Sequence, residues 1–122
     1  MERKSRVLII EDIHELADVL RQLVEIMGFS CQCASNGEEG LALLSSFPEP
    51  PLLILCDITL PGIDGFEVLR RVRADAVWSD VVFVAMSGNM HDKRTTLEMG
   101  ANHYLLKPFN MSDLAAVLNT LL

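Results

Sequence analysis

Short apolar segments alternate with longer stretches in which apolar residues return at helical spacing, and this alternation repeats along the chain. The short segments, which we expect to form β-strands, are residues 7–10, 29–34, 52–56, 81–86 and 101–106. The first of them, Val-Leu-Ile-Ile, is continuous and rich in β-branched residues. Such a run is typical of a strand that is covered on both faces.

The stretch after each strand predicts a helix with its own boundary signals. Apolar residues at helical spacing cover residues 14–27, and Gly28 suits the C-terminal cap of that helix. Residues 35–38 are Ser-Asn-Gly-Glu, a capping-box pattern for the second helix. Asp64 and Asn89 are the predicted N-terminal caps of the third and fourth helices.

The last two predicted helices differ in apolar content. The fourth is almost wholly polar from His91 to Thr96, with Leu97 and Met99 as its main apolar support, so we expect it to be the least firmly packed. The last helix covers residues 111–122 and is rich in Leu, Val and Ala. Exposed apolar residues on this helix hint at docking or homodimerisation.

Five strands that alternate with five helices predict an α/β domain, in which helices cover both faces of a parallel sheet. No composition shift, linker or repeat divides the chain. Residues 1–122 are therefore predicted to form a single doubly wound domain. Right-handed crossovers leave few topologies open, but the pattern alone does not give the strand order.

Composition narrows the class of protein. Half of the 122 residues are apolar, which is enough for a packed core. The net charge of −7 repels phosphate backbones, so we expect no direct binding of nucleic acid. The three cysteines form no disulfide framework, and the sequence shows neither a signal peptide nor a membrane-spanning apolar run. These features together predict a cytoplasmic domain without membrane association.

Polar side chains follow four of the five predicted strands. Asp12 follows the first, Asp57 the third, Ser87 the fourth and Lys107 the fifth. In an open parallel sheet, the carboxyl ends of the strands form the ligand crevice. We therefore expect these residues, which are far apart in the sequence, to gather at one edge of the sheet.

The residue types in this set point to phosphoryl chemistry. Glu11, Asp12 and Asp57 would repel one another without a cation, and oxygen ligands with no His or Cys nearby suit Mg²⁺. A carboxylate beside Mg²⁺ can attack phosphorus and form an aspartyl-phosphate. The Lys107 ammonium would neutralise charge on the phosphoryl oxygens, and the Ser87 hydroxyl can donate a hydrogen bond to one of them.

Four segments in order resemble the receiver domain of response regulators, the phospho-accepting module of two-component signalling. They are residues 7–12, Asp57 with residues 60–65, residues 85–88 and residues 100–109. The resemblance covers essentially the whole chain. It implies a flavodoxin-like sheet with strand order 2-1-3-4-5, and a signalling module that catalyses its own phosphorylation and dephosphorylation rather than an enzyme.

The resemblance also assigns a role to each residue of the acidic site. It implies that Asp57 is the phospho-acceptor. It further implies that Mg²⁺ is held by Glu11, Asp12, Asp57 and the backbone carbonyl of Thr59. The implied phosphoryl donor is the phosphohistidine of a sensor histidine kinase or of a histidine phosphotransfer protein.

Further roles implied by the resemblance concern the response to the phosphoryl group. Lys107 would contact this group, Ser87 would be the switch hydroxyl, and Tyr104 would change rotamer with Ser87. The face made by the fourth helix, the fifth strand and the last helix would then change shape. Lys107–Pro108 is a candidate for a cis peptide bond. The downstream output domain or protein is not identified by these residues.

Three other functions are compatible with a domain of this layout. A Mg²⁺-dependent phosphatase with an aspartyl nucleophile would need a nearby general acid and a substrate-covering cap, but Thr59 is no acid and no insertion is long enough. A flavin-binding module would need a phosphate-cradling loop after the first strand, where Glu11 and Asp12 repel phosphate. An interaction module with an inactive site stays open, although the intact set of site residues argues against it.

Overall fold

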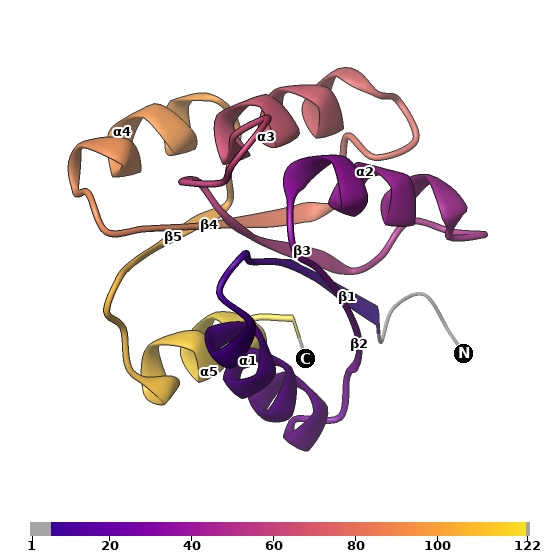
Figure 1. Cartoon of the computed structure of the whole chain (residues 1–122). Coiled ribbons are helices and arrows are strands. Elements are labelled where there is room, and N and C mark those ends of the chain that lie inside the picture. Colours follow the sequence, from indigo (N-terminus) through magenta and orange to yellow (C-terminus); the bar gives the residue numbers. More distant parts are fainter. Residues whose placement is uncertain (1–5, 122) are drawn as a thin grey trace.

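The computed structural model describes residues 6–121 and contains one five-stranded sheet in which all neighbouring strands are parallel (Figure 1). Its strands are β1 (Arg6–Ile10), β2 (Ser30–Ala34), β3 (Leu53–Asp57), β4 (Val82–Ser87) and β5 (His103–Leu106). Its helices are α1 (His14–Ile26), α2 (Gly37–Ser46), α3 (Gly65–Ala74), α4 (His91–Glu98) and α5 (Met111–Asn119). Residues 1–5 and 122, which the predicted domain includes, lie outside the described residues.

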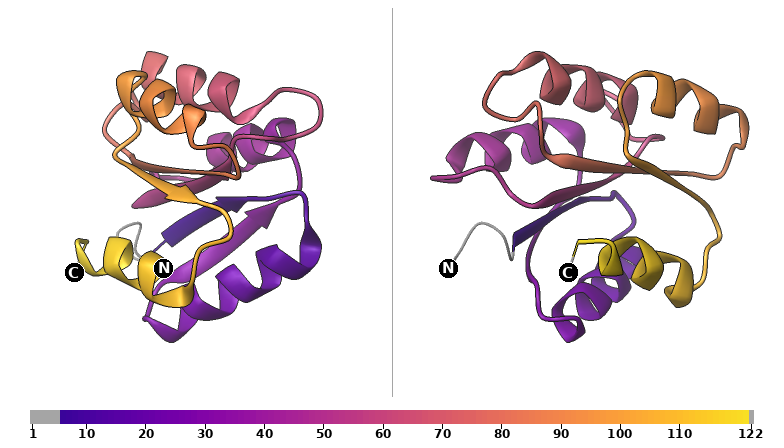
Figure 2. Two further views of the ribbon diagram at one scale, coloured as in Figure 1. Left: turned by 90° about the vertical axis from the view of Figure 1, so that its left-hand side faces the viewer. Right: turned by 180° about the vertical axis from the view of Figure 1, so that it is seen from behind.

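Helices cover both faces of the sheet. Figures 1 and 2 show α1 and α5 together on one face, and α2, α3 and α4 on the other. The strand order is β2-β1-β3-β4-β5. The predicted doubly wound fold and the strand order implied by the resemblance are therefore confirmed. Among the helices that the structure describes, none is both long enough and apolar enough to cross a bilayer.

The core consists of two apolar clusters, one on each side of the sheet. Successive residues of a strand point to opposite faces. Leu8 and Cys56 accordingly belong to the cluster on the α2 and α3 side, whereas Ile9 and Leu55 belong to the cluster on the α1 and α5 side. Both faces of the central strands are therefore buried, which explains why their sequences are continuous apolar runs.

The N-terminal cap of α2 differs from the prediction by one residue. The Asn36 side chain accepts a hydrogen bond from the Glu39 backbone N–H at 2.7 Å, and the Glu39 carboxylate accepts one from the Ser35 N–H at 2.7 Å. The predicted pairing of Ser35 with Glu38 is wrong, because the backbone is still extended at Asn36 and the helix begins after it.

The other predicted caps have mixed outcomes. Gly28 follows α1 with a φ of 96°, as expected of a C-terminal cap. The Asp64 side chain accepts a hydrogen bond from the Glu67 backbone N–H in the first turn of α3, as predicted. Asn89 is not the N-terminal cap of α4, because the next residue, Met90, holds that position. The Asn89 side chain instead accepts a hydrogen bond from the His91 N–H at 2.9 Å, which closes a turn ahead of the helix.

The packing of α4 is as sparse as its sequence predicts, but it rests on a different residue. Thr96 is the buried residue of this helix, and its hydroxyl donates to the Asp92 carbonyl at 2.9 Å. Met99 packs against the core, whereas Leu97 is 39% exposed. The expectation that Leu97 supports the helix is therefore wrong, because the sheet side of α4 is the side that carries Thr96.

Candidate functional site

The loops that follow β1, β3, β4 and β5 meet at the carboxyl edge of the sheet. Backbone hydrogen bonds connect the ends of β3, β4 and β5. The Ile58 N–H donates to the Met86 carbonyl at 2.8 Å, and the Lys107 N–H donates to the Ser87 carbonyl at 2.7 Å. The parallel register thus brings together strand ends that are separated by whole helices in the sequence.

Three carboxylates form a cluster at this edge. Oxygen atoms of Glu11, Asp12 and Asp57 all lie within 4.8 Å of one another. Glu11 and Asp57 are 1% and 4% exposed, whereas Asp12 is exposed. The Thr59 N–H donates to Asp57 Oδ1 at 3.0 Å and orients this carboxylate. The cluster therefore has a buried side and a side that is open to water.

The ammonium of Lys107 compensates part of this negative charge. Its Nζ donates to Glu11 Oε1 at 2.8 Å and to Asp57 Oδ2 at 3.1 Å. Burial raises the pKa of Glu11 above its usual value, and the hydrogen bond from Lys107 opposes this effect. Burial alone would lower the pKa of Lys107, but the hydrogen bonds and charges of the two carboxylates outweigh it and raise that pKa.

The donor set of the cluster fits a hard divalent cation. It offers three carboxylate groups, and Asp12 faces solvent, so that water can complete an octahedral shell. Mg²⁺ prefers this combination of a few carboxylates and water over an all-protein cage. With one ammonium facing three carboxylates, the site keeps a net negative charge that a cation would balance.

The backbone around Asp57 is shaped by the loop between β3 and α3. The Gly65 N–H donates to the Ile58 carbonyl at 2.9 Å, and Gly62 has a φ of 73°. A Cβ atom at Gly65 would lie 2.4 Å from the Asp57 carbonyl oxygen, so only glycine fits this close approach. On the opposite side of the site, the Lys107–Pro108 peptide bond is cis.

Ser87 and Tyr104 lie in one hydrogen-bond network beside the cluster. The buried Ser87 hydroxyl donates to Asp92 Oδ2 at 2.6 Å and accepts from the Asn89 N–H at 2.9 Å. The Tyr104 hydroxyl donates to the Asn89 carbonyl at 2.7 Å and lies 3.1 Å from Ser87 Oγ. Sequence reasoning did not identify Asp92 as a partner of Ser87. The available signal was an acidic residue in the first turn of the helix that follows the strand.

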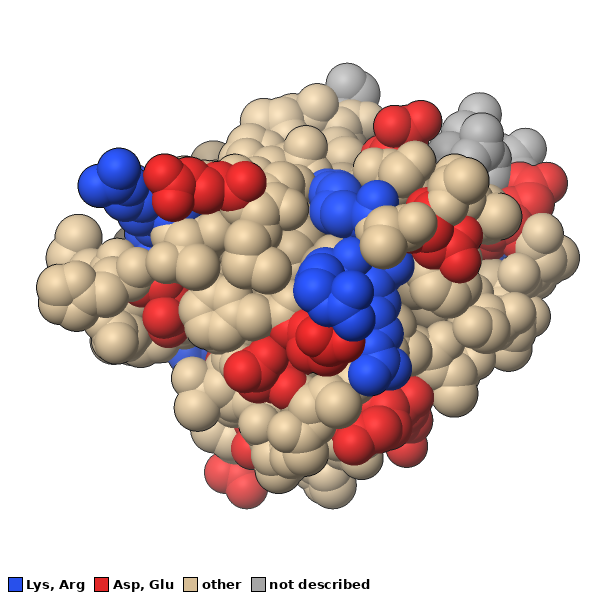
Figure 3. Space-filling view, turned by 90° about the horizontal axis from the view of Figure 1, so that it is seen from above, with Lys and Arg blue, Asp and Glu red and all other residues tan. Residues whose placement is uncertain are grey.

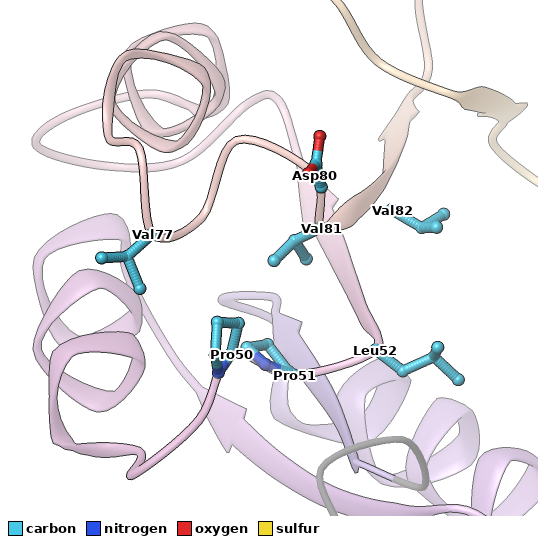
Figure 4. A pocket seen from close by; sticks show the side chains of 7 residues that line it. All are labelled: Pro50, Pro51, Leu52, Val77, Asp80, Val81 and Val82. Carbon is cyan, nitrogen blue, oxygen red and sulfur yellow. The ribbon is translucent and has the colours of Figure 1, made fainter.

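The structure also has a cavity away from the acidic cluster and a band of basic side chains over the helices of one face (Figure 3). A cavity of about 310 Å³ lies at the amino ends of β3 and β4, lined by residues 50–52, Val77 and residues 80–82 (Figure 4). None of the predicted site residues lines it. Figure 3 looks onto the face formed by α2, α3 and α4, where basic side chains form a narrow band beside acidic ones. On α3 this mixture includes Arg70 and Arg71, which both pair with Glu67.

Comparison with known proteins identifies the family. A family model for the response regulator receiver domain matches residues 7–119. The chain therefore belongs to the response regulator receiver domain family, the signalling module of two-component response regulators. Receiver domains bind Mg²⁺ at an acidic pocket, and Glu11, Asp12 and Asp57 form a cluster of carboxylates at the carboxyl edge of the sheet in this chain.

Relatives with curated descriptions are transcriptional regulators. The uncharacterized transcriptional regulatory protein YkoG of Bacillus subtilis is 38% identical over 113 residues, which are 93% of this chain and 49% of YkoG. The transcriptional regulatory protein PcoR of Escherichia coli is 34% identical over 118 residues, 97% of this chain and 51% of PcoR. The chain thus spans about half the length of these relatives.

Solved structures of response regulators share the fold. A putative response regulator from Chloroflexus aurantiacus superposes with a TM-score of 0.89 at 29% identity and covers 96% of both chains. The response regulator TrrA of Thermotoga maritima, solved in complex with Mg(2+)-BeF, superposes with a TM-score of 0.84 at 27% identity. This match covers 97% of the present chain and 99% of TrrA.

Proposed function

We propose that this receiver domain accepts a phosphoryl group on Asp57 from the phosphohistidine of a sensor histidine kinase or of a histidine phosphotransfer protein. The observation that carries this proposal is the environment of the Asp57 carboxylate. It is 4% exposed, it belongs to an acidic cluster that suits Mg²⁺, and it lies 3.1 Å from the Lys107 ammonium. A carboxylate in this setting is oriented as a nucleophile and faces the positive charge that an incoming phosphoryl group needs.

The side chains of the site have separate tasks in this transfer. The Thr59 N–H and the Lys107 ammonium each hold one oxygen of Asp57. An Asp57 oxygen forms the new bond to phosphorus, while the bond between phosphorus and the donor imidazole nitrogen breaks. Lys107 stabilises the charge that spreads over the phosphoryl oxygens. When bound by Glu11, Asp12, Asp57 and the Thr59 carbonyl, Mg²⁺ supplies further neutralisation of that charge.

The signal is proposed to leave the site through Ser87 and Tyr104. Once Asp57 is phosphorylated, the Ser87 hydroxyl donates to a phosphoryl oxygen, and the Tyr104 side chain moves into the space that this opens. The face formed by α4, β5 and α5 changes as a result. The small number of buried residues on α4 supports this step, because elements that switch are drawn from the less stable parts of a fold.

The output of the domain is proposed to be control of transcription. This proposal rests on the relatives, which are transcriptional regulators about twice as long as the present chain. The altered α4-β5-α5 face would contact an output domain or a separate protein. The net charge of −7 repels phosphate backbones, so we assign any contact with nucleic acid to a part of the regulator other than this domain.

Phosphorylation can be tested directly by incubation with a small phosphodonor in the presence of Mg²⁺, followed by intact mass measurement. We expect one added phosphoryl group in the wild type, none in Asp57→Asn, and none when a chelator removes Mg²⁺. Asp64→Ser is the matched control, because it removes a carboxylate of the same loop but keeps a side chain that can cap α3. An undiminished adduct in Asp57→Asn would refute the assignment.

A further inference from the structure

The Ser87 hydroxyl already uses its single donor within the protein. It accepts from the Asn89 N–H at 2.9 Å and donates to Asp92 Oδ2 at 2.6 Å. A separation of about 2.5–2.7 Å is typical of a hydroxyl that donates to an ionised carboxylate. The Asn89 carbonyl, at 3.1 Å, is a longer and uncharged alternative. Since a hydroxyl has one proton, that proton is committed to Asp92.

Asp92 is held in place by the start of α4. Its backbone N–H donates to the Asn89 carbonyl at 3.0 Å, and its own carbonyl accepts the Thr96 hydroxyl at 2.9 Å. A carboxylate in the first turn of a helix is also stabilised by the helix dipole. The backbone of Asp92 is thus held by contacts that do not involve Ser87, and its carboxylate competes with any other acceptor for the Ser87 proton.

We propose that Asp92 is a positioning residue that restrains the switch hydroxyl until the domain is phosphorylated. Ser87 can donate its proton either to Asp92 or to a phosphoryl oxygen on Asp57, and each choice excludes the other. Asp92 thereby weakens the apparent affinity of the site for the phosphoryl group, because the hydrogen bond between Ser87 and Asp92 must break before Ser87 can turn. This inference rests on the proposed function, because the phosphoryl oxygen is the acceptor that competes with Asp92.

The same contact couples the switch hydroxyl to α4 and to Tyr104. The Tyr104 hydroxyl donates to the Asn89 carbonyl at 2.7 Å, on the short loop that joins Ser87 to α4. When Ser87 turns away from Asp92, the first turn of α4 loses a side-chain connection to the end of β4, and the loop under Tyr104 is released. The hydrogen bond between Ser87 and Asp92 therefore links phosphorylation of Asp57 to the α4-β5-α5 face.

The chain allows this coupling to be observed at a single position, because Tyr104 is its only tyrosine. Incorporation of 3-fluorotyrosine places one ¹⁹F probe on the side chain that responds to Ser87. The wild type, Asp92→Asn and Asp92→Ala are then titrated with beryllofluoride in the presence of Mg²⁺. Beryllofluoride is the stand-in for the phosphoryl group, and the half-saturating concentration and the ¹⁹F shift are the two readouts.

We expect the half-saturating beryllofluoride concentration to fall by about tenfold in Asp92→Ala, because a charge-assisted hydrogen bond no longer opposes the turn of Ser87. Asp92→Asn keeps a neutral acceptor, so a fall of about threefold is expected. In both unliganded variants, the ¹⁹F resonance of Tyr104 should move toward its beryllofluoride-bound position. A residue with a purely structural role would not produce this shift.

Two controls separate the hydrogen bond from the loss of charge. Glu98→Gln removes one negative charge from the same helix at an exposed position, and it should leave the midpoint unchanged. In a Ser87→Ala background, Asp92→Ala should change the midpoint by less than about twofold, as expected of two residues that act through one contact. An equally large change without the Ser87 hydroxyl would overturn the role of Asp92.

The remaining outcomes distinguish this inference from the proposed function. A normal beryllofluoride response of the wild type, with the same midpoint in Asp92→Ala, would overturn the role of Asp92 alone. No response of the wild type, together with no phosphoryl adduct, would overturn the proposed function and the role of Asp92 with it.

Discussion

Replacement of Gly65 by alanine should displace the backbone that carries Asp57. A Cβ atom at this position would lie 2.4 Å from the Asp57 carbonyl oxygen and 2.5 Å from the Ile58 Cα. Favourable contacts between such atoms are about 3.5 Å or longer, so the overlap is roughly 1 Å. Both atoms belong to the backbone, and neither can rotate away. The strand end or the start of α3 must therefore move.

The cost of this displacement can be estimated from overpacking in other cores. Extra atoms in a packed site lower the free energy of unfolding by about 1–3 kcal/mol. The higher helix propensity of alanine offsets up to about 1 kcal/mol of this loss. For Gly65→Ala we expect the free energy of unfolding to fall by about 1–2 kcal/mol and Tm to fall by roughly 4–8 °C. A displacement near 1 Å at the nucleophile should also slow phosphorylation of Asp57 by about tenfold or more.

Urea denaturation followed by the fluorescence of Trp78, the only tryptophan, measures the stability change. Gly88→Ala is the matched control, because Gly88 also lies beside the site but a Cβ atom there would meet nothing within 4 Å. Its free energy of unfolding should change by less than about 0.5 kcal/mol. Equal urea midpoints for Gly65→Ala and Gly88→Ala would refute the argument from close approach.

Three further predictions concern charged side chains. Lys107→Met should lower the free energy of unfolding by about 3 kcal/mol in chelator-treated protein, because the buried carboxylates of Glu11 and Asp57 lose their counter-charge. An unchanged midpoint in urea denaturation would contradict this prediction. Arg73 donates to three backbone carbonyls and one side-chain amide oxygen. Arg73→Met should therefore cost about 2–3 kcal/mol in urea denaturation, and Arg73→Lys should recover only part of that loss. Hydrogen bonds from Arg70 and Arg71 lower the pKa of Glu67 from 4.5 to about 2, so its contribution to stability is present above pH 4.5 and is lost as the pH falls toward about 2. An NMR titration of the Glu67 carboxyl should show the pKa rising toward 4.5 when both arginines are replaced by Gln, and an unchanged pKa would show that these contacts do not persist in solution.

Local sequence signals predicted the elements well and their ends less well. The capping pattern at residues 35–38 indicated a helix start, but the cap is Asn36, because two adjacent residues could each accept the first N–H groups. In α4, Leu97 was the predicted apolar support, yet Thr96 is the buried residue. The rotation of a short helix about its axis depends on what it packs against, and eight residues with few apolar side chains do not specify it.

The same distinction applies to the site. The residues Glu11, Asp12, Asp57 and Lys107 could be selected from the sequence because each follows a predicted strand. For Ser87 the sequence offered an acidic residue in the first turn of the next helix, but this signal does not single out a partner, because a hydroxyl has many possible acceptors. Only the path of the loop into α4 brings the Asp92 carboxylate to 2.6 Å.

By itself, the sequence determined the order and type of the elements, the alternation that requires a parallel sheet, and the polar residues at the strand ends. These follow from side-chain periodicity and turn residues, which act over a few positions. Only the tertiary structure decided which strand ends meet. Lys107 lies 2.8 Å from Glu11 across 96 positions of sequence, because the strand order places β3 between β1 and β4, so that the ends of β1 and β3 lie side by side within reach of the Lys107 side chain. The apolar pattern of a central strand specifies burial on both faces but not the identity of its neighbours. The charge balance at Asp57 is therefore a property of the assembled sheet.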